Sequence, residues 1–452
     1  MHRLVVRLIM VAFSVVTVIA NGEENLKFPK DFKWGVATCE YQNSGSTKCP
    51  DSNWAHWEQQ EGAIKTGEIS GESTCHYDNE QRTIQQIKAL GCNTYRFSVE
   101  WSLIEPIQGE YNEEVIDHYS DFVDELLANG IEPMITLHHF SHPQWFEELG
   151  AFEKTENNKF LVLFAKKMFN RLSDRVKLWV TINEPGVYAA QGYYWADFPP
   201  GKKLINRQVF KPTATVVKNL MMAHASMYGT MKRELNGREC QIGLVHQFLK
   251  FMSANILTQP FTTHLTYVYH KGIFEFLKSG EFKFGYRFGL GKEEMKIKKA
   301  KEMMDFIGIN YYTMPLVKAE MKMNFENTTC DEEAGEYMTD MPFRAYPQGL
   351  GEVIRECHEE LGLPIYITEN GAPDREDKFR GRWIRDHLKQ VSDAIADGCD
   401  VRGFYYWTLN DNWEWDRGYS QKFGLYEYDF ETHRPTLREG SREYVRIIRE
   451  SK

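Results

Sequence analysis

Residues 179–185 read Trp-Val-Thr-Ile-Asn-Glu-Pro, and residues 364–371 read Pro-Ile-Tyr-Ile-Thr-Glu-Asn-Gly. Each stretch is a short apolar run, rich in β-branched residues, that ends in a glutamate (Glu184 or Glu369) and is followed by turn-forming residues. The pattern predicts two buried strands with a carboxylate at the carboxyl end of each, where parallel α/β enzymes hold their catalytic groups. Only a closed tertiary fold can bring two such distant glutamates together.

Six further runs of this kind alternate with amphipathic helical stretches, which is the pattern of a parallel sheet covered by helices. The eight predicted strands are residues 32–38, 92–98, 131–138, 177–182, 240–247, 305–311, 364–368 and 402–408. Eight parallel strands close a barrel, so we predict an α/β fold, a single (β/α)8 TIM barrel. The chain of 452 residues shows no linker or internal repeat. We therefore expect one domain over residues 21–452; a split near residue 200 is the alternative.

The connections between the predicted strands contain helices and long loops. The predicted helices are residues 79–90, 115–129, 159–172, 216–235 and 382–397. Four segments are longer than ordinary connections, at 39–77, 183–212, 248–300 and 313–347. Long loops at the top of a barrel usually shape a pocket, so we expect these βα loops to form the active site.

The N-terminus has the features of an export signal. Positively charged residues precede an uncharged apolar run from Leu8 to Ala20, and Val18 and Ala20 form a small-residue cleavage site. The run is too short for a permanent bilayer span. We predict a signal peptide over residues 1–20 and a secreted or extracytoplasmic protein, with an uncleaved membrane anchor as the alternative. No later segment has the uncharged length of a transmembrane helix, so we expect no membrane span in the mature protein.

The composition restricts the partners. A hydrophobic content of 42% with 14% aromatic residues supports a large core. A net charge of −10 would repel nucleic acid and anionic membranes, so a neutral small molecule is the expected partner. The eight cysteines show no Cys-x-x-Cys and no paired histidine spacing, which argues against a zinc site. No motif requires a metal or an organic cofactor. Some cysteines could pair in an oxidising compartment, and Asn327-Thr328-Thr329 is the one glycosylation sequon.

Seven motifs carry a more specific signal. In chain order they are Phe32-Lys-Trp-Gly-Val-Ala-Thr with Glu40-Tyr41-Gln42, Tyr95-Arg96-Phe97-Ser98-Val99-Glu100-Trp101, Thr136-Leu137-His138-His139, Thr181-Ile182-Asn183-Glu184-Pro185, Asp305-Phe306-Ile307-Gly308-Ile309-Asn310-Tyr311-Tyr312, Ile367-Thr368-Glu369-Asn370-Gly371, and Trp407-Thr408-Leu409-Asn410-Asp411-Asn412-Trp413-Glu414-Trp415. In these motifs the chain resembles glycoside hydrolase family 1, the β-glycosidases that include β-glucosidases, β-galactosidases, myrosinases and lactase-phlorizin hydrolase.

The resemblance implies a catalytic role for four residues. Glu369 corresponds to the nucleophile that forms a covalent glycosyl-enzyme, and Glu184 to the acid that protonates the leaving oxygen and later activates water. Arg96 and Tyr312 would donate to Glu369 and favour its charged form. A purely structural role is the alternative for Arg96 and Tyr312, as an ion-pair partner and as a core residue.

The resemblance also implies a set of sugar-binding residues. The hydroxyl-binding side chains would be Gln42, His139, Asn183, Asn310 and Glu414, with the Trp407 ring as a platform and the Trp415 indole as a donor. Glu414 favours an unphosphorylated substrate, because a carboxylate would repel a phosphate on the 6-position. Lys422 resembles a phosphate contact only loosely.

The sequence departs from the family pattern at three places. Phe140 replaces the usual tryptophan after the histidine of the third-strand motif, Asn43-Ser44-Gly45 replaces the usual Glu-Gly, and the 248–300 region is short and lacks the usual Tyr-Pro. These changes predict an altered pocket wall. The expected activity is hydrolysis of terminal β-D-glucosides, β-D-galactosides or β-D-fucosides with retention. Two alternatives are a catalytically silent carbohydrate-binding relative on the same barrel and a predominant transglycosidase.

Overall fold

The computed structural model describes residues 26–202, 204, 206–286, 290–318 and 328–452. The predicted signal peptide over residues 1–20 lies outside these ranges, as does Asn327 of the sequon, so both remain predictions. None of the described helices has the length and hydrophobicity needed to cross a bilayer. All eight cysteines lie within the described residues and are free thiols, and only Cys75 and Cys330 among them are partly exposed.

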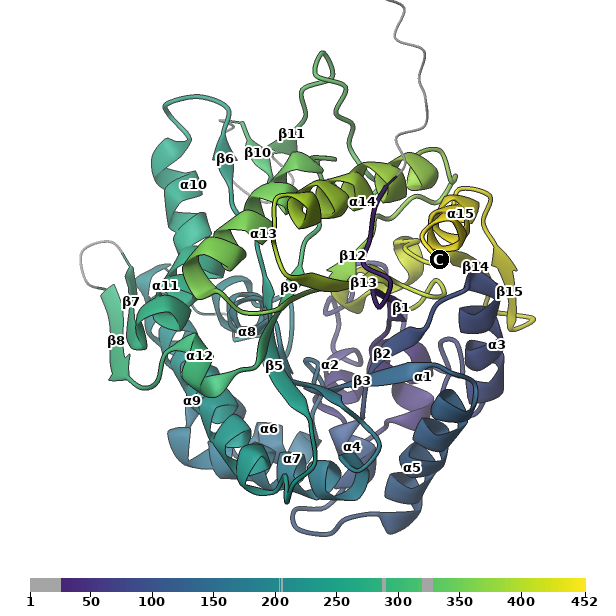
Figure 1. Cartoon of the computed structure of the whole chain (residues 1–452). Helices are drawn as coiled ribbons and strands as arrows, with labels where there is room; N and C mark the ends of the chain where they lie inside the picture. Colours follow the sequence, from purple (N-terminus) through teal and green to yellow (C-terminus); the bar gives the residue numbers. More distant parts are fainter. Residues whose placement is uncertain (1–25, 203, 205, 287–289, 319–327) are drawn as a thin grey trace, which may run out of the picture.

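Eight parallel strands form a closed barrel in the order β1-β13-β12-β9-β5-β4-β3-β2, with helices around it (Figure 1). The strands are β1 (Lys33–Ala37), β2 (Thr94–Ser98), β3 (Glu132–His138), β4 (Leu178–Asn183), β5 (Gln241–Gln247), β9 (Phe306–Asn310), β12 (Ile365–Asn370) and β13 (Val401–Trp407). All eight predicted strands are present, each with ends within two residues of the predicted ones. The predicted TIM barrel is confirmed.

The long helices pack their apolar faces against the strands. They are α3 (Glu80–Leu90), α5 (Glu113–Ala128), α7 (Asn158–Leu172), α9 (Phe210–Arg233), α13 (Gln348–Leu361), α14 (Arg380–Ala396) and α15 (Arg442–Glu450). Helix α9 begins six residues before the predicted start at 216. Pro212 lies in the first turn of α9, where a helix tolerates proline because the missing N–H has no intrahelical acceptor there.

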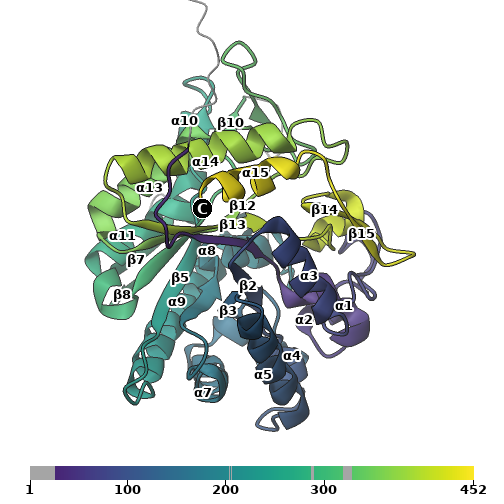
Figure 2. The ribbon, with the colours of Figure 1, turned by 45° about the vertical axis from the view of Figure 1, so that its right-hand side comes forward.

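The long connections carry additional short elements. They contain the helices α1 (Glu40–Lys48), α2 (Asn53–Trp57), α4 (Trp101–Ile104), α6 (Gln144–Glu148), α8 (Pro185–Ala189), α10 (Gln259–Thr266), α11 (Gly272–Ser279) and α12 (Ala300–Met303). Two antiparallel hairpins, β7–β8 (Glu281–Tyr286, Leu290–Lys296) and β14–β15 (Tyr426–Asp429, Arg434–Leu437), and a small sheet of β6 (Met252–Ser253), β10 (Leu316–Val317) and β11 (Thr328–Thr329) complete the fold. In both Figure 1 and Figure 2 the β14–β15 hairpin lies beside α3.

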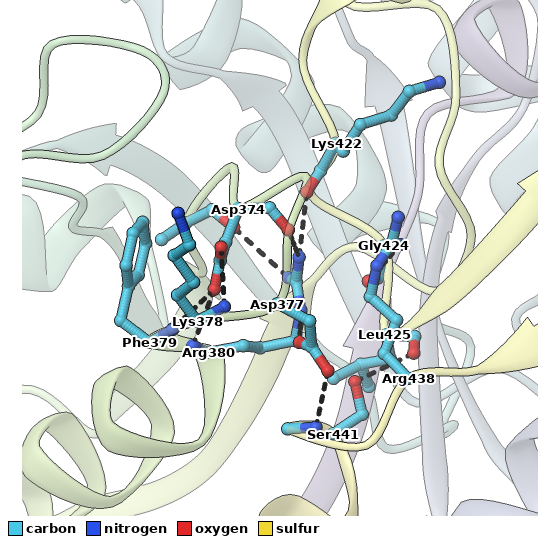
Figure 3. A network of polar contacts seen from close by, with 12 residues as sticks. Asp374, Asp377, Lys378, Phe379, Arg380, Lys422, Gly424, Leu425, Arg438 and Ser441 are labelled. Atoms are coloured by element: carbon cyan, nitrogen blue, oxygen red, sulfur yellow. Dashed lines mark hydrogen bonds and ion pairs between the residues drawn. The ribbon is translucent and has the colours of Figure 1, made fainter.

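A buried arginine holds the loops that follow β12 and β13 together (Figure 3). The Arg380 guanidinium donates to the carbonyl oxygens of Ala372 and Asp374 in the first loop and of Lys422 and Phe423 in the second. The Asp374 carboxylate accepts from the backbone N–H groups at the start of α14. Both loops lead away from strands that carry predicted site residues, so this network fixes the frame around the site.

Candidate active site

The two glutamates lie at the carboxyl ends of their strands, as predicted. Glu369 is the penultimate residue of β12, and Glu184 directly follows β4 and precedes α8. Both side chains are buried, with relative exposures of 3% and 5%. The pairing register of β12 shifts between Ile367 and Glu369, and that of β4 shifts just before Asn183. Such irregularities re-aim side chains, and here they occur immediately before each carboxylate.

Three residues around the site have a left-handed backbone that non-glycine residues rarely adopt. They are Glu184 (φ 46°), Phe140 (φ 66°) and Trp415 (φ 49°). A bulky side chain in this region costs about 1–3 kcal/mol, so the surrounding structure must impose it. All three side chains line the same pocket. The strain is therefore concentrated where side chains must point into one cavity.

Glu369 is held by a cation and a phenol. The Arg96 Nη1 atom donates to Glu369 Oε1 over 2.7 Å, and the Tyr312 hydroxyl donates to Glu369 Oε2 over 2.6 Å. Arg96 is itself buried, with 1% exposure, and also donates to the Thr368 carbonyl oxygen. Hydrogen bonds from a cation and a hydroxyl favour the carboxylate over the carboxylic acid. Both Glu369 oxygens thus accept hydrogen bonds from buried side chains.

A chain of side-chain hydrogen bonds connects the two glutamates. Arg96 Nη2 donates to Asn183 Oδ1 over 2.7 Å, and Asn310 Nδ2 donates both to Asn183 Oδ1 (3.2 Å) and to Glu184 Oε1 (2.6 Å). Thr368 Oγ1 donates to Asn310 Oδ1 over 2.7 Å. The Asn310 amide thus contacts protein groups on both its oxygen and its nitrogen. Asn310 thus contacts Glu184, and it is not among the described residues that line the pocket.

The environment of Glu184 favours its protonated form. Burial raises the pKa of Glu184 well above its usual range, and the neighbouring Glu369 charge raises it further. The Asn310 hydrogen bond and the Arg96 charge oppose this rise in pKa. One carboxyl group thus accepts from a cation and a phenol, while the pKa of its neighbour is raised. This is the division of roles that paired acid and nucleophile chemistry requires.

A pocket of about 270 Å³ opens above the two glutamates. Its described walls comprise Lys65, His139, Phe140, Glu184, Val187, Gln191, Trp195, Asp197, Phe198, Gln247, Leu249, Tyr269, Tyr312, Thr313, Pro315, Thr328, Met341, Pro342, Phe343, Glu369, Trp407, Glu414, Trp415, Asp416, Arg417 and Phe423. Each of the four long segments predicted to shape a pocket contributes to this wall. The predicted residues His139, Trp407, Glu414 and Trp415 line it directly.

Gln42 and His139 each have a buried polar atom with no hydrogen-bond partner among the described residues. Gln42 Nε2 donates to the Trp413 carbonyl oxygen and to Glu414 Oε2, but Gln42 Oε1 has no partner. Asn183 Nδ2 donates to His139 Nε2 over 3.0 Å, which places the His139 proton on Nδ1, and Nδ1 has no partner. Leaving a buried donor or acceptor unpaired costs about 1–3 kcal/mol. A polar ligand in the adjacent pocket would satisfy both atoms.

Glu414 is a half-buried carboxyl group in the wall. Burial, with the charges of Glu369 and Asp416, raises the pKa of Glu414 to about 8. The cations that line the described pocket are Lys65 and Arg417, and both face Asp416, at 2.6 Å and 3.7 Å. Lys422 is not among the described lining residues; its ammonium lies over the Phe430 ring, 5.0 Å from the centroid.

The pocket wall also contains residues that we did not predict from the sequence. Gln191 and Trp195 belong to a π-helical turn, Ala190–Trp195, that continues α8. Single π turns occur frequently at functional sites, but their hydrogen-bond pattern leaves no sequence signature. Leu249 and Tyr269 come from the short 248–300 region, which therefore still contributes to the pocket. Phe140 packs its ring 5.4 Å from that of Trp415, so it preserves an aromatic wall.

The chain is similar to proteins of known family. Residues 24–452 match the model of glycosyl hydrolase family 1. The chain is 29% identical to β-glucosidase A of Thermotoga maritima, over 94% of this chain and 98% of that protein. It is also 29% identical to a 6-phospho-β-galactosidase of Clostridium acetobutylicum, with the same two coverages. The solved β-glycosidase from Pyrococcus horikoshii matches with a TM-score of 0.80 and 31% identity, over 94% of this chain and 96% of that one.

Proposed function

The chain belongs to glycosyl hydrolase family 1 and is a glycoside hydrolase, and we propose that it is a retaining β-glycosidase. Its substrates would be terminal, unphosphorylated β-D-glucosides, β-D-galactosides or β-D-fucosides. The observation that carries the proposal is the unequal environment of two buried carboxyl groups in one pocket. Arg96 and Tyr312 donate to Glu369, whereas burial and the Glu369 charge keep the proton on Glu184. Retaining hydrolysis uses an anionic nucleophile beside a protonated acid.

The first step forms a covalent intermediate. The Glu369 carboxylate attacks the anomeric carbon, and the bond from this carbon to the glycosidic oxygen breaks. Glu184 gives its proton to that oxygen, so the aglycone leaves as a neutral alcohol. The glycosyl ester on Glu369 has lost the negative charge that helped to raise the pKa of Glu184. The pKa of Glu184 therefore falls, and Glu184 becomes a base.

The second step reverses these roles. Glu184 takes a proton from water as the water oxygen attacks the anomeric carbon, and the ester bond to Glu369 breaks. The sugar leaves with its original β configuration, Glu369 is again a carboxylate and Glu184 is again protonated. Arg96 and Tyr312 then stabilise the regenerated charge.

We assign sugar binding to the polar atoms that surround the inner pocket. The unpartnered Nδ1–H of His139 and Oε1 of Gln42 would bind hydroxyl groups, and Glu414 would bind a further pair. Asn183 Nδ2 uses one hydrogen for His139 and has a second for the 2-hydroxyl next to the reacting carbon. Trp407 offers a flat apolar face, and the Trp415 indole N–H a donor. Asn310 contacts Glu184 and is, like Gln42 and Asn183, not among the described lining residues, so it would act on the acid as well as on the sugar.

The pocket wall favours a neutral sugar over a phosphorylated one. Asp416 is acidic, Glu414 adds a second negative charge above its raised pKa of about 8, and the two lining cations face Asp416. Like charges brought together in a binding site cost several kcal/mol. We expect kcat/KM for a nitrophenyl β-glucoside to exceed that for the corresponding 6-phosphate by about 10²-fold or more. A higher kcat/KM for the 6-phosphate would contradict the proposed preference for an unphosphorylated sugar.

Replacing Asn310 with alanine tests whether the Asn310 side chain lowers the pKa of Glu184. The change removes the N–H that lowers the pKa of Glu184. The pKa of Glu184 then rises, and the basic limb of the kcat/KM profile moves to higher pH. Thr368→Val is the matched control, because it removes a hydrogen bond to Asn310 but none to Glu184. A basic limb that stays in place, or moves down, would exclude this role for Asn310.

The stereochemistry of the first product tests the proposed function. Purified protein is incubated with aryl β-glucoside, β-galactoside and β-fucoside, and the sugar is followed by proton NMR before it mutarotates. The β anomer is the expected first product, and an α anomer would refute the retaining mechanism. Absence of turnover on the whole panel would favour the silent binding relative. A large yield of alkyl glycoside in added alcohol would favour the transglycosidase.

We also propose that the protein is secreted, from the N-terminal segment alone. Protein from the native host should then begin after Ala20 when its N-terminus is determined by mass spectrometry. An intact N-terminus would exclude cleavage.

A further inference from the structure

A group of three potential metal ligands lies outside the pocket. Glu72 and Cys75 belong to the segment that precedes α3, and His433 lies in the turn of the β14–β15 hairpin. Both figures of the ribbon show this hairpin beside α3 (Figure 1, Figure 2). One ligand atom from each residue lies within 4.8 Å of the other two. The three side chains are partly or fully exposed, so a cation from solution could reach them.

The ligand atoms lie near enough to one another to share one cation. Cys75 Sγ lies 3.7 Å from Glu72 Oε2, and the His433 ring lies between them, with Nδ1 3.6 Å from Cys75 Sγ and Nε2 3.8 Å from Glu72 Oε2. Zinc bonds of about 2.0–2.3 Å to N, O and S at tetrahedral angles place neighbouring ligand atoms roughly 3.4–3.6 Å apart. The exposed Glu72 side chain and the partly exposed His433 ring would move by side-chain rotation to bring one ring nitrogen to this separation.

Tyr428 orients the imidazole of His433. The Tyr428 hydroxyl donates to the Thr74 carbonyl oxygen over 2.9 Å, so its oxygen is left to accept from His433 Nδ1–H, at 3.3 Å. In that tautomer the lone pair of His433 lies on Nε2, 3.8 Å from Glu72 Oε2. A histidine that donates one ring N–H to a neighbour and presents the other nitrogen is the usual arrangement of a metal ligand.

We propose that Glu72, Cys75 and His433 bind Zn²⁺ or a divalent cation of similar softness. A thiolate, an imidazole and a carboxylate are the ligand types that zinc takes, and hard cations such as Mg²⁺ and Ca²⁺ prefer oxygen alone. Three protein ligands leave a fourth position for water. The spacing rules that predicted no zinc site did not detect this group, because Cys75 and His433 are 358 positions apart.

The local charges set the conditions for binding. Partial burial and the Glu72 charge raise the pKa of the Cys75 thiol. Arg82 is the neighbouring cation; it donates to the carbonyl oxygens of Thr74 and His433 and lies over the Tyr428 ring. Arg82 therefore opposes the cation by charge while it fixes both segments that supply ligands.

A bound cation would also fix a segment that supports the pocket. Ser73 Oγ donates to the Gln42 carbonyl oxygen, and the Thr74 N–H donates to the Asn43 carbonyl oxygen. Cys75 follows directly, so the cation would link the hairpin to the backbone that carries Gln42. A ligand that binds only the folded state raises the free energy of unfolding by an amount that grows with the logarithm of ligand concentration over Kd, and Tm rises with it. We expect Tm to rise with Zn²⁺ concentration.

Cobalt titration tests the site. The reduced, chelator-treated protein is titrated with Co²⁺, and a thiolate-to-cobalt charge-transfer band should saturate at one equivalent and disappear when Zn²⁺ is added. Cys75→Ser should abolish the band, and His433→Gln should weaken Co²⁺ binding at least tenfold. Cys330→Ser, at the other partly exposed cysteine, is the matched control and should leave the band unchanged.

Two results would overturn the proposal. One is a band that persists in Cys75→Ser; the other is the absence of any saturable band in the wild-type protein at a large excess of Co²⁺. Circular dichroism and turnover of the metal-free variants show whether they fold. If Cys75→Ser fails to fold, Glu72→Gln provides the same test on an exposed side chain, with loss of Co²⁺ affinity expected and unchanged affinity contradictory.

Discussion

Replacing Glu369 with glycine is expected to lower kcat on aryl β-glycosides by about 10⁴-fold or more, as found when a covalent nucleophile is removed. The glycine leaves a space beside the anomeric carbon, between Arg96 and Tyr312. Added azide should enter this space and attack the same carbon. Because azide then replaces the leaving group directly, the expected product is an α-glycosyl azide, formed with inversion.

A surface variant controls for the substitution itself. Glu332 is an exposed glutamate in a turn, and Glu332→Gly should leave kcat unchanged. Thermal unfolding of both variants shows whether the fold is kept. If Glu369→Gly retained more than a small fraction of wild-type turnover, or if azide gave the β-glycosyl product, Glu369 would not be the nucleophile.

Replacing Glu184 with glutamine is expected to have the second largest effect, and this effect should depend on the leaving group. Glutamine keeps the shape but cannot donate the proton, and loss of an acid-base group costs about 10²–10⁴-fold. Alkyl glycosides, whose leaving groups need a proton, should suffer the full loss. Glycosides of acidic phenols should form the glycosyl-enzyme almost normally and then accumulate it, because no base activates water.

Azide and pH distinguish the second variant from the first. In Glu184→Gln, azide needs no base and attacks the glycosyl-enzyme on Glu369, so a β-glycosyl azide is expected. The basic limb of kcat/KM, which reflects loss of the Glu184 proton as pH rises through its raised pKa, should disappear. An α-glycosyl azide, or an unchanged basic limb, would exclude Glu184 as the acid. The two glutamate variants thus act as controls for each other, with opposite products.

The barrel could be predicted from the sequence because each strand is a short apolar run bounded by turn residues. Where a strand ends depends on tertiary contacts with residues far away in the sequence. The predicted strand ends therefore differ from the observed ones by up to two residues. Among the predicted helices, α9 differs most, because it begins six residues before the predicted start at 216. The positions of Glu184 and Glu369 followed from the same runs.

The contacts within the site could not be predicted from the residues themselves. The hydrogen bond from Arg96 to Glu369 joins residues that are 273 positions apart in the sequence, and only the family resemblance suggested this contact. The left-handed backbones of Phe140 and Trp415 are imposed by tertiary packing, which no local pattern reveals. Asn310 belongs to a matched motif, yet its contact with Glu184 depends on the register of two strands. The cluster of Cys75 with His433 depends on where a hairpin packs.

Trapping the intermediate tests the central claim most directly. The protein is incubated with a 2-deoxy-2-fluoro-β-glucoside that has a good leaving group; the fluorine slows both steps, and the good leaving group lets the first proceed. Peptide mass spectrometry of the stalled protein should then find one fluoroglycosyl group, attached to Glu369, with activity lost in proportion to labelling. A label on Glu184 or another residue, or complete inactivation without any covalent label, would contradict the assignment of Glu369 as the nucleophile.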